Sequence, residues 1–254
     1  MSEVRYVRPQ TFPPVIKNLL IINVLVWLAQ LFYDKKYALT DKLSLQPILP
    51  RQLKQVLVDN HVITTDYGFN PYQIITHMFA HASYGPPPDY DIIFYHILFN
   101  MFALWMFGRV LESVWGAKRF LLFYLACGVG AALFHLLIQY FRCEMLLHHI
   151  EAGAVIDPEQ LSGAIASAVG ASGAIMGVLA GFAFLFPNTE LFIMFLPIPI
   201  KAKWAVGALI LFDLLGGTIG VAGDNIAHFA HLGGALTGLI IVYIWNKTNR
   251  KTLY

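Results

Sequence analysis

A single serine stands in the stretch GASGAIMG, residues 170–177, where every other residue is apolar or glycine. A serine hydroxyl is a poor nucleophile unless a base within hydrogen-bonding distance takes its proton. Neutral imidazole suits that task near pH 7. His231, in the stretch AHLGGALTG (230–238), is the candidate base for Ser172, because both residues lie near the outer ends of apolar segments.

Two further polar residues are placed to stabilise negative charge. His96 and Asn100 are spaced i and i+4, which puts them on one face of a helix. A helix that begins at Ser172 also offers backbone N–H groups without intrahelical partners, which can bind an anion. A nucleophile, a base and these donors are the parts of a serine hydrolase site with an oxyanion hole.

Less specific interpretations compete with this one. A serine among small residues most often serves close helix packing, and Gly173, Gly177 and Gly181 at four-residue spacing support packing in either case. Gly234 and Gly238 do the same around His231. Most other histidines are expected to be ordinary core or surface groups: His77, His81, His135, His148, His149 and His228.

Three other ionisable residues fall in or beside the apolar segments. Asp213 is a possible third member of the catalytic group, but we predict a structural role for it near the end of its segment. Arg109 and Glu112 are predicted to form a local ion pair. We predict no metal site: His77 and His81 have ligand spacing, but no neighbouring carboxylate completes a site.

The composition shows where these residues must act. The chain has 254 residues, of which 57% are hydrophobic and 13% charged, whereas soluble domains average about 25% charged residues. This predicts a polytopic membrane protein, and a net charge of +2 is too small to suggest binding to nucleic acid. We predict six spans of roughly the 20 residues that a bilayer requires, at 15–33, 91–112, 119–141, 168–186, 203–220 and 227–245.

The domain organisation follows from these spans. We predict an N-terminal cytoplasmic segment (1–14), one membrane domain (15–246) with a long extracytoplasmic loop (34–90), and a cytoplasmic tail (247–254). The apolar segment 191–204 contains Pro197 and Pro199 and is expected to lie at an interface. With six spans, four basic groups fall on one side, which the positive-inside rule makes cytoplasmic: Arg5, Arg8 and Lys17; Arg109, Lys118 and Arg119; Lys201 and Lys203; and Lys247, Arg250 and Lys251.

Taken together, the motifs resemble the rhomboid family of intramembrane serine proteases. The resemblance spans residues 15–245 and rests on four stretches in family order: THMFAHAS (76–83), HILFNMFALWMFGRVLE (96–112), GASGAIMG (170–177) and AHLGGALTG (230–238). It implies an all-α membrane protein with a six-transmembrane-helix, rhomboid-like bundle and a water-filled cavity open to the outer face.

The resemblance also implies roles. Ser172 would be the nucleophile and His231 its general base and acid, while His96, Asn100 and the Ser172 backbone N–H would stabilise the oxyanion. It implies no metal or organic cofactor. The implied substrates are single-span membrane proteins, cleaved in or near the transmembrane segment while both partners lie in the lipid bilayer.

The sequence departs from the family pattern at two places. Met176 stands where many relatives have a tyrosine stacked against the catalytic histidine, and a thioether can also pack on imidazole. Tyr72-Gln73 stands where many relatives have Trp-Arg, so this loop is expected to lie differently at the membrane surface. His228 precedes His231 by three residues and has no role in the predicted site.

Two rival functions differ in class. A rhomboid-like pseudoprotease, acting in membrane-protein binding or quality control, would be favoured by loss of the serine or histidine, and both are present. A proton-coupled transporter using Asp213 would be expected to carry inverted repeats, and none is recognisable. Six spans, compact size and the lack of a recognisable targeting signal favour a bacterial inner membrane, with both termini cytoplasmic. An organelle membrane is the alternative, and the oligomeric state is left open.

Overall fold

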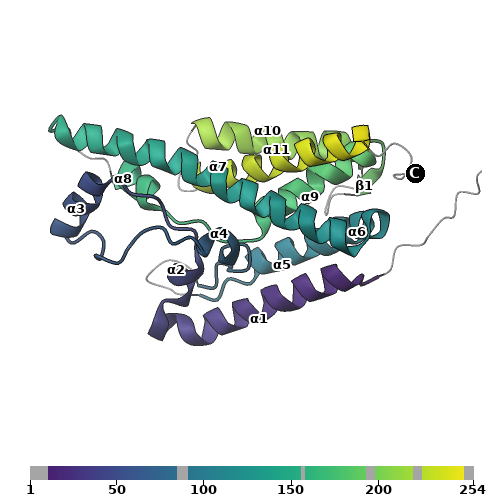
Figure 1. The fold of residues 1–254 in the computed structure, drawn as a ribbon, viewed down its shortest axis with the longest axis horizontal. Helices are drawn as coiled ribbons and strands as arrows, with labels where there is room; N and C mark the ends of the chain where they lie inside the picture. Colours follow the sequence, from purple (N-terminus) through teal and green to yellow (C-terminus); the bar gives the residue numbers. More distant parts are fainter. Residues whose placement is uncertain (1–10, 85–90, 156–157, 193–197, 220–224, 249–254) are drawn as a thin grey trace, which may run out of the picture.

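The computed structural model describes residues 11–84, 91–155, 158–192, 198–219 and 225–248, and these are mostly helical (Figure 1). The first half of the chain contains α1 (Pro14–Tyr37), α2 (Leu39–Leu43), α3 (Arg51–Asp59), α4 (Gln73–Thr76), α5 (Tyr95–Ala103), the π-helical turn η1 (Leu104–Gly108) and α6 (Arg109–Trp115). The second half contains α7 (Ala117–Glu151), α8 (Pro158–Ile165), α9 (Ser172–Leu185), strands β1 (Glu190–Phe192) and β2 (Pro199–Lys201), α10 (Ala202–Ile219) and α11 (Asn225–Thr248). The predicted all-α class is confirmed.

Four helices in the described part of the chain are long and apolar enough to cross a bilayer: Pro14–Tyr37, Tyr95–Trp115, Ala117–Glu151 and His228–Thr248. The chain is therefore a multi-pass membrane protein. α9 is apolar but has 14 residues, and α10 has 18. The exact count of six spans is not confirmed, and membrane crossing by α9 and α10 stays a prediction.

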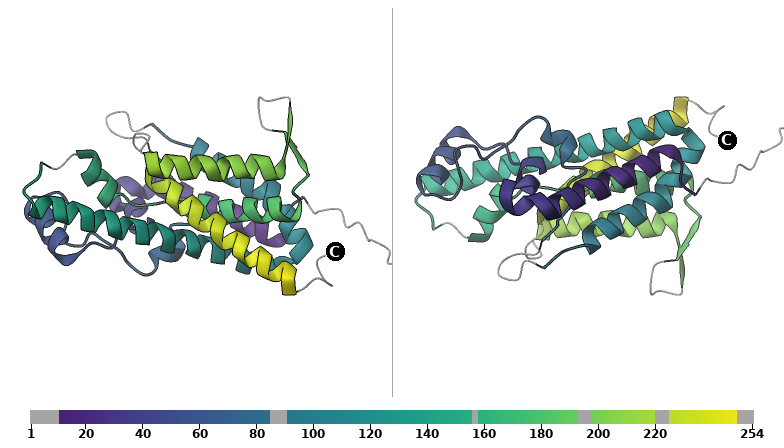
Figure 2. Two further views of the ribbon diagram at one scale, coloured as in Figure 1. Left: turned by 90° about the horizontal axis from the view of Figure 1, so that it is seen from above. Right: turned by 90° about the horizontal axis from the view of Figure 1, so that it is seen from below.

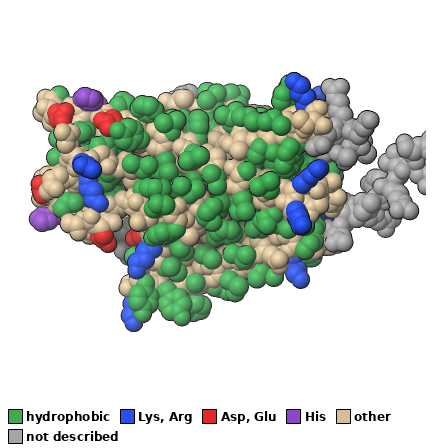
Figure 3. All heavy atoms as spheres, viewed as in Figure 1, with side chains coloured by type: hydrophobic (Ala, Val, Ile, Leu, Met, Phe, Trp, Pro, Cys, Tyr) green, Lys and Arg blue, Asp and Glu red, His purple; other side chains and the backbone are tan. Residues whose placement is uncertain are grey.

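The outer surface agrees with a membrane environment. Figure 3 shows hydrophobic side chains covering most of one face, while Lys and Arg side chains gather towards its ends. Large apolar side chains point outward from three of the long helices, among them Phe32 at 79% exposure, Leu122 at 62% and Tyr243 at 57%. Exposing so much contiguous apolar surface to water would be unfavourable, whereas lipid tails can contact it without this cost.

α7 is longer than the sequence analysis predicted, since it ends at Glu151 and not near residue 141. At 1.5 Å per residue its 35 residues extend about 52 Å, well beyond the ~30 Å hydrocarbon core. In the extension, Cys143, Leu146 and Leu147 are apolar residues at helical spacing. They pack in one cluster with Leu53 and Leu57 of α3 and Ala164 of α8, and this cluster stabilises the extension. This satellite core explains why the helix continues past bilayer length.

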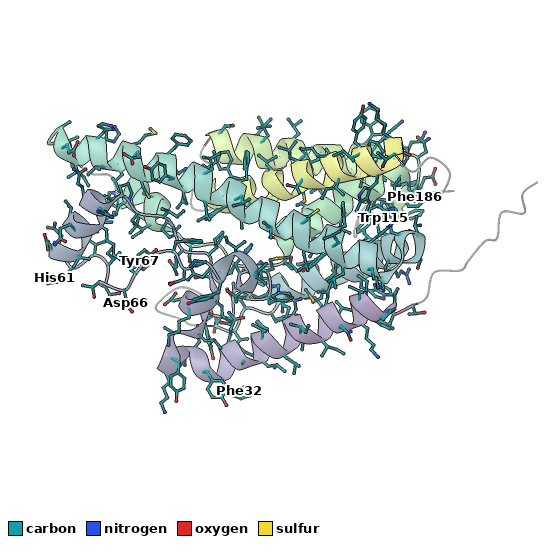
Figure 4. The ribbon with its side chains drawn as sticks, in the orientation of Figure 1. Phe32, His61, Asp66, Tyr67, Trp115 and Phe186 are labelled. Atoms are coloured by element: carbon teal, nitrogen blue, oxygen red, sulfur yellow. The ribbon has the colours of Figure 1, made fainter. Side chains whose placement is uncertain are left out.

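The segment between α1 and α5 is folded around three short helices. Figure 4 shows His61, Asp66 and Tyr67 at the end of the molecule opposite Trp115 and Phe186. The Tyr67 hydroxyl donates a hydrogen bond to the carbonyl of Ile165 at the end of α8. Burial raises the pKa of Tyr67 to about 12, so the phenol stays protonated and can donate at neutral pH.

Gln73 anchors the same segment, at the position where the family resemblance leads us to expect Arg. It is 2% exposed, and its Oε1 accepts the backbone N–H of Asn70 at 2.9 Å and of Gln46 at 3.3 Å. Its Nε2 donates to the carbonyl of Lys42 at 3.3 Å. A buried amide that serves three backbone groups accounts for glutamine here, since arginine has no acceptor.

Glycines let α7, α9 and α11 pack with their backbones close together (Figure 1). A Cβ on Gly234 would lie 1.8 Å from the Gly173 carbonyl oxygen, and one on Gly238 would lie 2.7 Å from that of Gly177. A Cβ on Gly177 would meet the Cys127 sulfur at 2.4 Å. The packing predicted for these glycines is confirmed, and Cys127 is buried at this contact.

The predicted ion pair between Arg109 and Glu112 is wrong. Glu112 is 3% exposed and accepts the backbone N–H of Val15 at 3.0 Å and of Ile16 at 2.9 Å. These groups belong to the first turn of α1, where backbone N–H groups have no intrahelical acceptor. Arg109 instead lies 4.4 Å from the centre of the Trp105 ring. The spacing of the two residues suggested the ion pair, but the Glu112 carboxylate instead accepts the free N–H groups at the start of α1.

The segment 191–204 does not form a membrane-length helix. Its described residues contribute to a two-stranded antiparallel hairpin, in which Glu190 pairs with Lys201 and Phe192 with Pro199. Figure 2 shows this hairpin extending from the end of the bundle at which α11 ends. Residues 193–197, including Pro197, lie outside the described part of the chain.

Candidate active site

Ser172 and His231 lie side by side although 59 residues separate them. Ser172 is the first residue of α9, and His231 lies in α11. The Nε2 atom of His231 is 2.8 Å from Ser172 Oγ, within hydrogen-bonding distance. Gly173 directly follows Ser172, and Gly234 lies three residues after His231; close contact between these two glycines holds the helix backbones together. The glycine packing and the polar pair are therefore parts of one arrangement.

Asp213, for which a structural role was predicted, lies beside His231. It lies in α10, is 5% exposed, and its Oδ1 is 3.1 Å from His231 Nδ1. The same oxygen is 2.7 Å from Nδ1 of His228, for which the sequence suggested no role. Asp213 thus contacts the Ser172–His231 pair through His231, and the structural role predicted for it stays a prediction. A carboxylate inside an apolar helix was the available signal, but only the fold identifies its partners.

His96 is held in a defined orientation beside Ser172. Its Nδ1 accepts the backbone N–H of Ala82 at 3.0 Å. A neutral imidazole with one nitrogen accepting must carry its proton on the other, so His96 Nε2 is a donor. The His96 ring also makes an edge contact with His81, with centroids 5.2 Å apart. Position and tautomer are therefore both set by groups outside α5.

Gly170 separates His96 from Ser172. Its φ of +118° suits glycine, and its N–H donates to the carbonyl of His77 at 2.9 Å. A Cβ on this residue would lie 3.1 Å from His96 Nε2 and 3.6 Å from Ser172 Oγ. The missing side chain leaves open the space between the two groups. The same turn explains why α9 begins at Ser172, later than the predicted residue 168.

Asn100 lies one turn after His96 on α5 and is 8% exposed. Its Nδ2 donates to the His96 carbonyl at 2.8 Å. An amide nitrogen carries two N–H groups, so one is still available to a ligand.

These residues line one cavity of about 620 Å³. Its polar wall includes Ser172, His231, His96 and Asn100. The rest of the wall is mainly apolar or small, including Ile93, Tyr95, Phe99 and residues 166–170. All four residues predicted for the site therefore face the same space.

Comparison with known families decides the family. The model of the Rhomboid domain matches residues 69–248, which is most of the chain. The chain belongs to the rhomboid family. The match includes all four stretches that carried the resemblance, so that prediction is confirmed.

Several named rhomboids are similar to this chain. "Rhomboid protein 1, mitochondrial" of Saccharomyces cerevisiae is 29% identical over 190 residues, which is 75% of this chain and 46% of that protein. "RHOMBOID-like protein 12, mitochondrial" of Arabidopsis thaliana is 30% identical over 74% of this chain and 51% of its own length. "Presenilin-associated rhomboid-like protein, mitochondrial" of Homo sapiens is 33% identical over 63% and 37%.

The chain spans about half or less of the length of these relatives. All three are named as mitochondrial proteins, so the comparisons do not support the predicted bacterial inner membrane.

Met176 stands where the family resemblance leads us to expect a tyrosine. It is 6% exposed and belongs to the central apolar cluster, while its packing against His231 stays a prediction.

Asp213, His228 and His231 have three potential metal-ligand atoms within 4.8 Å of one another. Two of these separations are ordinary hydrogen-bond distances, so hydrogen bonding accounts for the cluster.

Proposed function

We propose that this rhomboid is an intramembrane serine endopeptidase that hydrolyses peptide bonds in or near the transmembrane segment of single-span membrane proteins. The observation that carries the proposal is the 2.8 Å approach of His231 Nε2 to Ser172 Oγ at the wall of the cavity. A serine used only for packing has no need of an imidazole in line with its hydroxyl.

The first chemical step is attack by the serine. Ser172 Oγ adds to the carbonyl carbon of the scissile bond while its proton passes to His231 Nε2. The carbonyl group of a helical peptide bond is engaged by the backbone, so the substrate helix must unwind before it can react. The polar groups around the cavity can pair with the backbone groups that unwinding exposes.

The oxyanion of the tetrahedral intermediate then needs donors. His96 supplies Nε2–H, which the contact with Ala82 leaves as the protonated nitrogen. Asn100 supplies its second N–H, and the first turn of α9 supplies backbone N–H groups. Fixed donors in a partly water-excluded site stabilise this charge without reorganisation.

Collapse of the intermediate completes the acylation half of the reaction. His231 gives the proton to the leaving amine, the C–N bond breaks, and an ester joins the substrate to Ser172. Water then attacks the ester with His231 again as base, which releases the acid product and restores the serine. The cavity supplies room for that water.

The decisive test is labelling of the detergent-purified protein with a fluorophosphonate, together with cleavage of a single-span model substrate. We expect the native protein to label and cleave, and Ser172→Ala and His231→Ala to do neither. A folded native protein that fails in both assays would instead support the pseudoprotease, a binding module that uses the same cavity.

A further inference from the structure

The predicted site is a serine–histidine dyad, yet the cluster beside His231 contains more than a dyad requires. We propose that Asp213 is a positioning residue that acts through His231, and that His228 in turn holds the carboxylate of Asp213. This inference rests on the proposed function. It makes the group at the cavity a Ser172–His231–Asp213 triad with a fourth, supporting residue.

The tautomer of His231 is the first argument. To accept the Ser172 proton, Nε2 must be unprotonated, so the ring proton of neutral His231 must lie on Nδ1. The acceptor in reach of that Nδ1–H is Asp213 Oδ1 at 3.1 Å. An ionised carboxylate only accepts hydrogen bonds, so this contact selects the tautomer in which Nε2 faces Ser172 as a base.

The second argument concerns the charge that develops during reaction. When His231 takes the serine proton, it becomes an imidazolium ion next to a buried carboxylate. Opposite charges at this separation attract more strongly in a site of low dielectric than in water. The contact is therefore stronger in the transition state than in the resting enzyme, which is the condition for raising kcat.

His228 is placed to keep the carboxylate in position. Its ring lies against the same helix as Asp213: a Cβ on Gly216 would be 2.5 Å from His228 Nε2, and the Phe212 ring centre is 5.6 Å away at 77°. This packing turns Nδ1 towards Asp213 Oδ1 at 2.7 Å. The missing side chain of Gly216 is thus what allows His228 to reach the carboxylate.

A purely structural interpretation makes different predictions. If Asp213 only joined α10 to α11, its shorter contact with His228 would contribute more to stability than its contact with His231. Replacing Asp213 or His228 would then mainly lower the free energy of unfolding. If Asp213 acts through His231, its loss must lower kcat more than loss of His228 does, with substrate binding retained.

The kinetic experiment compares Asp213→Asn, His228→Phe and the control Thr218→Val. His228→Phe keeps a ring between Phe212 and Gly216 but removes the hydrogen bond. Thr218 is exposed on α10, and its hydroxyl donates to the carbonyls of Leu214 and Leu215 of the same helix. We expect Asp213→Asn to lower kcat and the rate of fluorophosphonate labelling roughly 10- to 100-fold, with KM changed less than about twofold. His228→Phe should lower kcat and the labelling rate by a smaller factor, and Thr218→Val should have the kcat and labelling rate of the native enzyme. Equal losses in Asp213→Asn and His228→Phe, or a native kcat in folded Asp213→Asn, would overturn the proposal.

A second readout does not depend on activity. In protein with ¹⁵N-labelled histidine, we expect a ring N–H signal from His231 Nδ1 that is present in the native protein and in Ser172→Ala. It should be lost in Asp213→Asn and in His231→Gln. If this signal is observed in an inactive native protein, the proposed function fails while the positioning of His231 stands. If no His231 signal depends on Asp213, the positioning role fails even in an active enzyme.

Discussion

At the scale of single residues, the site depends on one side chain that is missing. Gly170 combines a positive φ with a position between His96 and Ser172, so two physical demands meet at one residue. The histidine and serine motifs draw attention first, but the space in which an oxyanion would form exists because this residue has no Cβ.

Replacing this glycine tests that interpretation. Gly170→Ala would place a methyl group 3.1 Å from His96 Nε2, on a backbone conformation that costs a non-glycine residue about 1–3 kcal/mol. We expect more than a tenfold loss of cleavage, measured with a single-span substrate in detergent. Gly163→Ala, a glycine with open space around its Cβ position, is the control and should cleave at the native rate. Native activity in Gly170→Ala would show that the site tolerates a displaced His96.

At the scale of helices, close backbone contact between α9 and α11 sets the distance between nucleophile and base. Ser172 and His231 each stand one to three residues from a glycine of that contact, so any separation of the helices at Gly173 and Gly234 also separates the polar pair. The sequence allowed two interpretations of this region, helix packing by small residues or a serine–histidine pair. In the fold both are present, and the packing sets the distance within the pair.

A single methyl group should open this contact. In Gly234→Ala the new Cβ would lie 1.8 Å from the Gly173 carbonyl oxygen, and backbone cannot move aside as a flexible side chain can. Overpacking of this kind costs about 1–3 kcal/mol. We expect a lower thermal unfolding temperature together with loss of fluorophosphonate labelling. Gly207→Ala in α10, which meets nothing within 4 Å, should show neither effect, and a labelled, stable Gly234→Ala would refute the coupling.

The start of α1 depends on a residue from a distant helix. Glu112→Gln keeps the size of the side chain but leaves only one oxygen for the two N–H groups of Val15 and Ile16. Leaving a buried donor without a partner costs about 1–3 kcal/mol. We expect that loss in denaturant unfolding in detergent. The exposed Glu190→Gln should unfold as the native protein does, and equal stability of the two variants would contradict the capping role.

At the scale of the whole molecule, the two ends of the bundle differ. α1 starts, and α11 ends, at the end that also holds the α6–α7 junction and the β1–β2 hairpin, while α2, α3 and α8 lie at the other end (Figures 1 and 2). The basic residues Lys17, Lys118, Lys201 and Lys247 belong to the first of these ends. The positive-inside rule concerns this clustering of basic residues, and the predicted orientation of the termini stays a prediction.

That orientation can be tested with single cysteines and a membrane-impermeant maleimide. We expect Thr11→Cys and Lys247→Cys to label from one side of sealed vesicles, and Asp66→Cys to label only from the other. The two natural cysteines are buried, so the unsubstituted protein is the control and should stay unlabelled. Labelling of all three positions from one side would exclude the predicted topology.

The amino-acid sequence determined the membrane class, the family and the four residues expected at the site. It could do so because bilayer-length apolar runs, glycine spacing and the serine and histidine motifs are local patterns. It also allowed the close helix packing to be predicted, since small residues at four-residue intervals have few other uses in apolar helices.

The tertiary structure decided which polar groups meet. The roles proposed for Asp213 and His228 rest on a contact between α10 and α11, and the capping role of Glu112 rests on a helix start almost a hundred residues away. The orientation of His96 depends on a backbone N–H at Ala82. A buried charge or donor must find a partner, but spacing along one helix does not reveal a partner on another, so this part of the site could be read only from the fold.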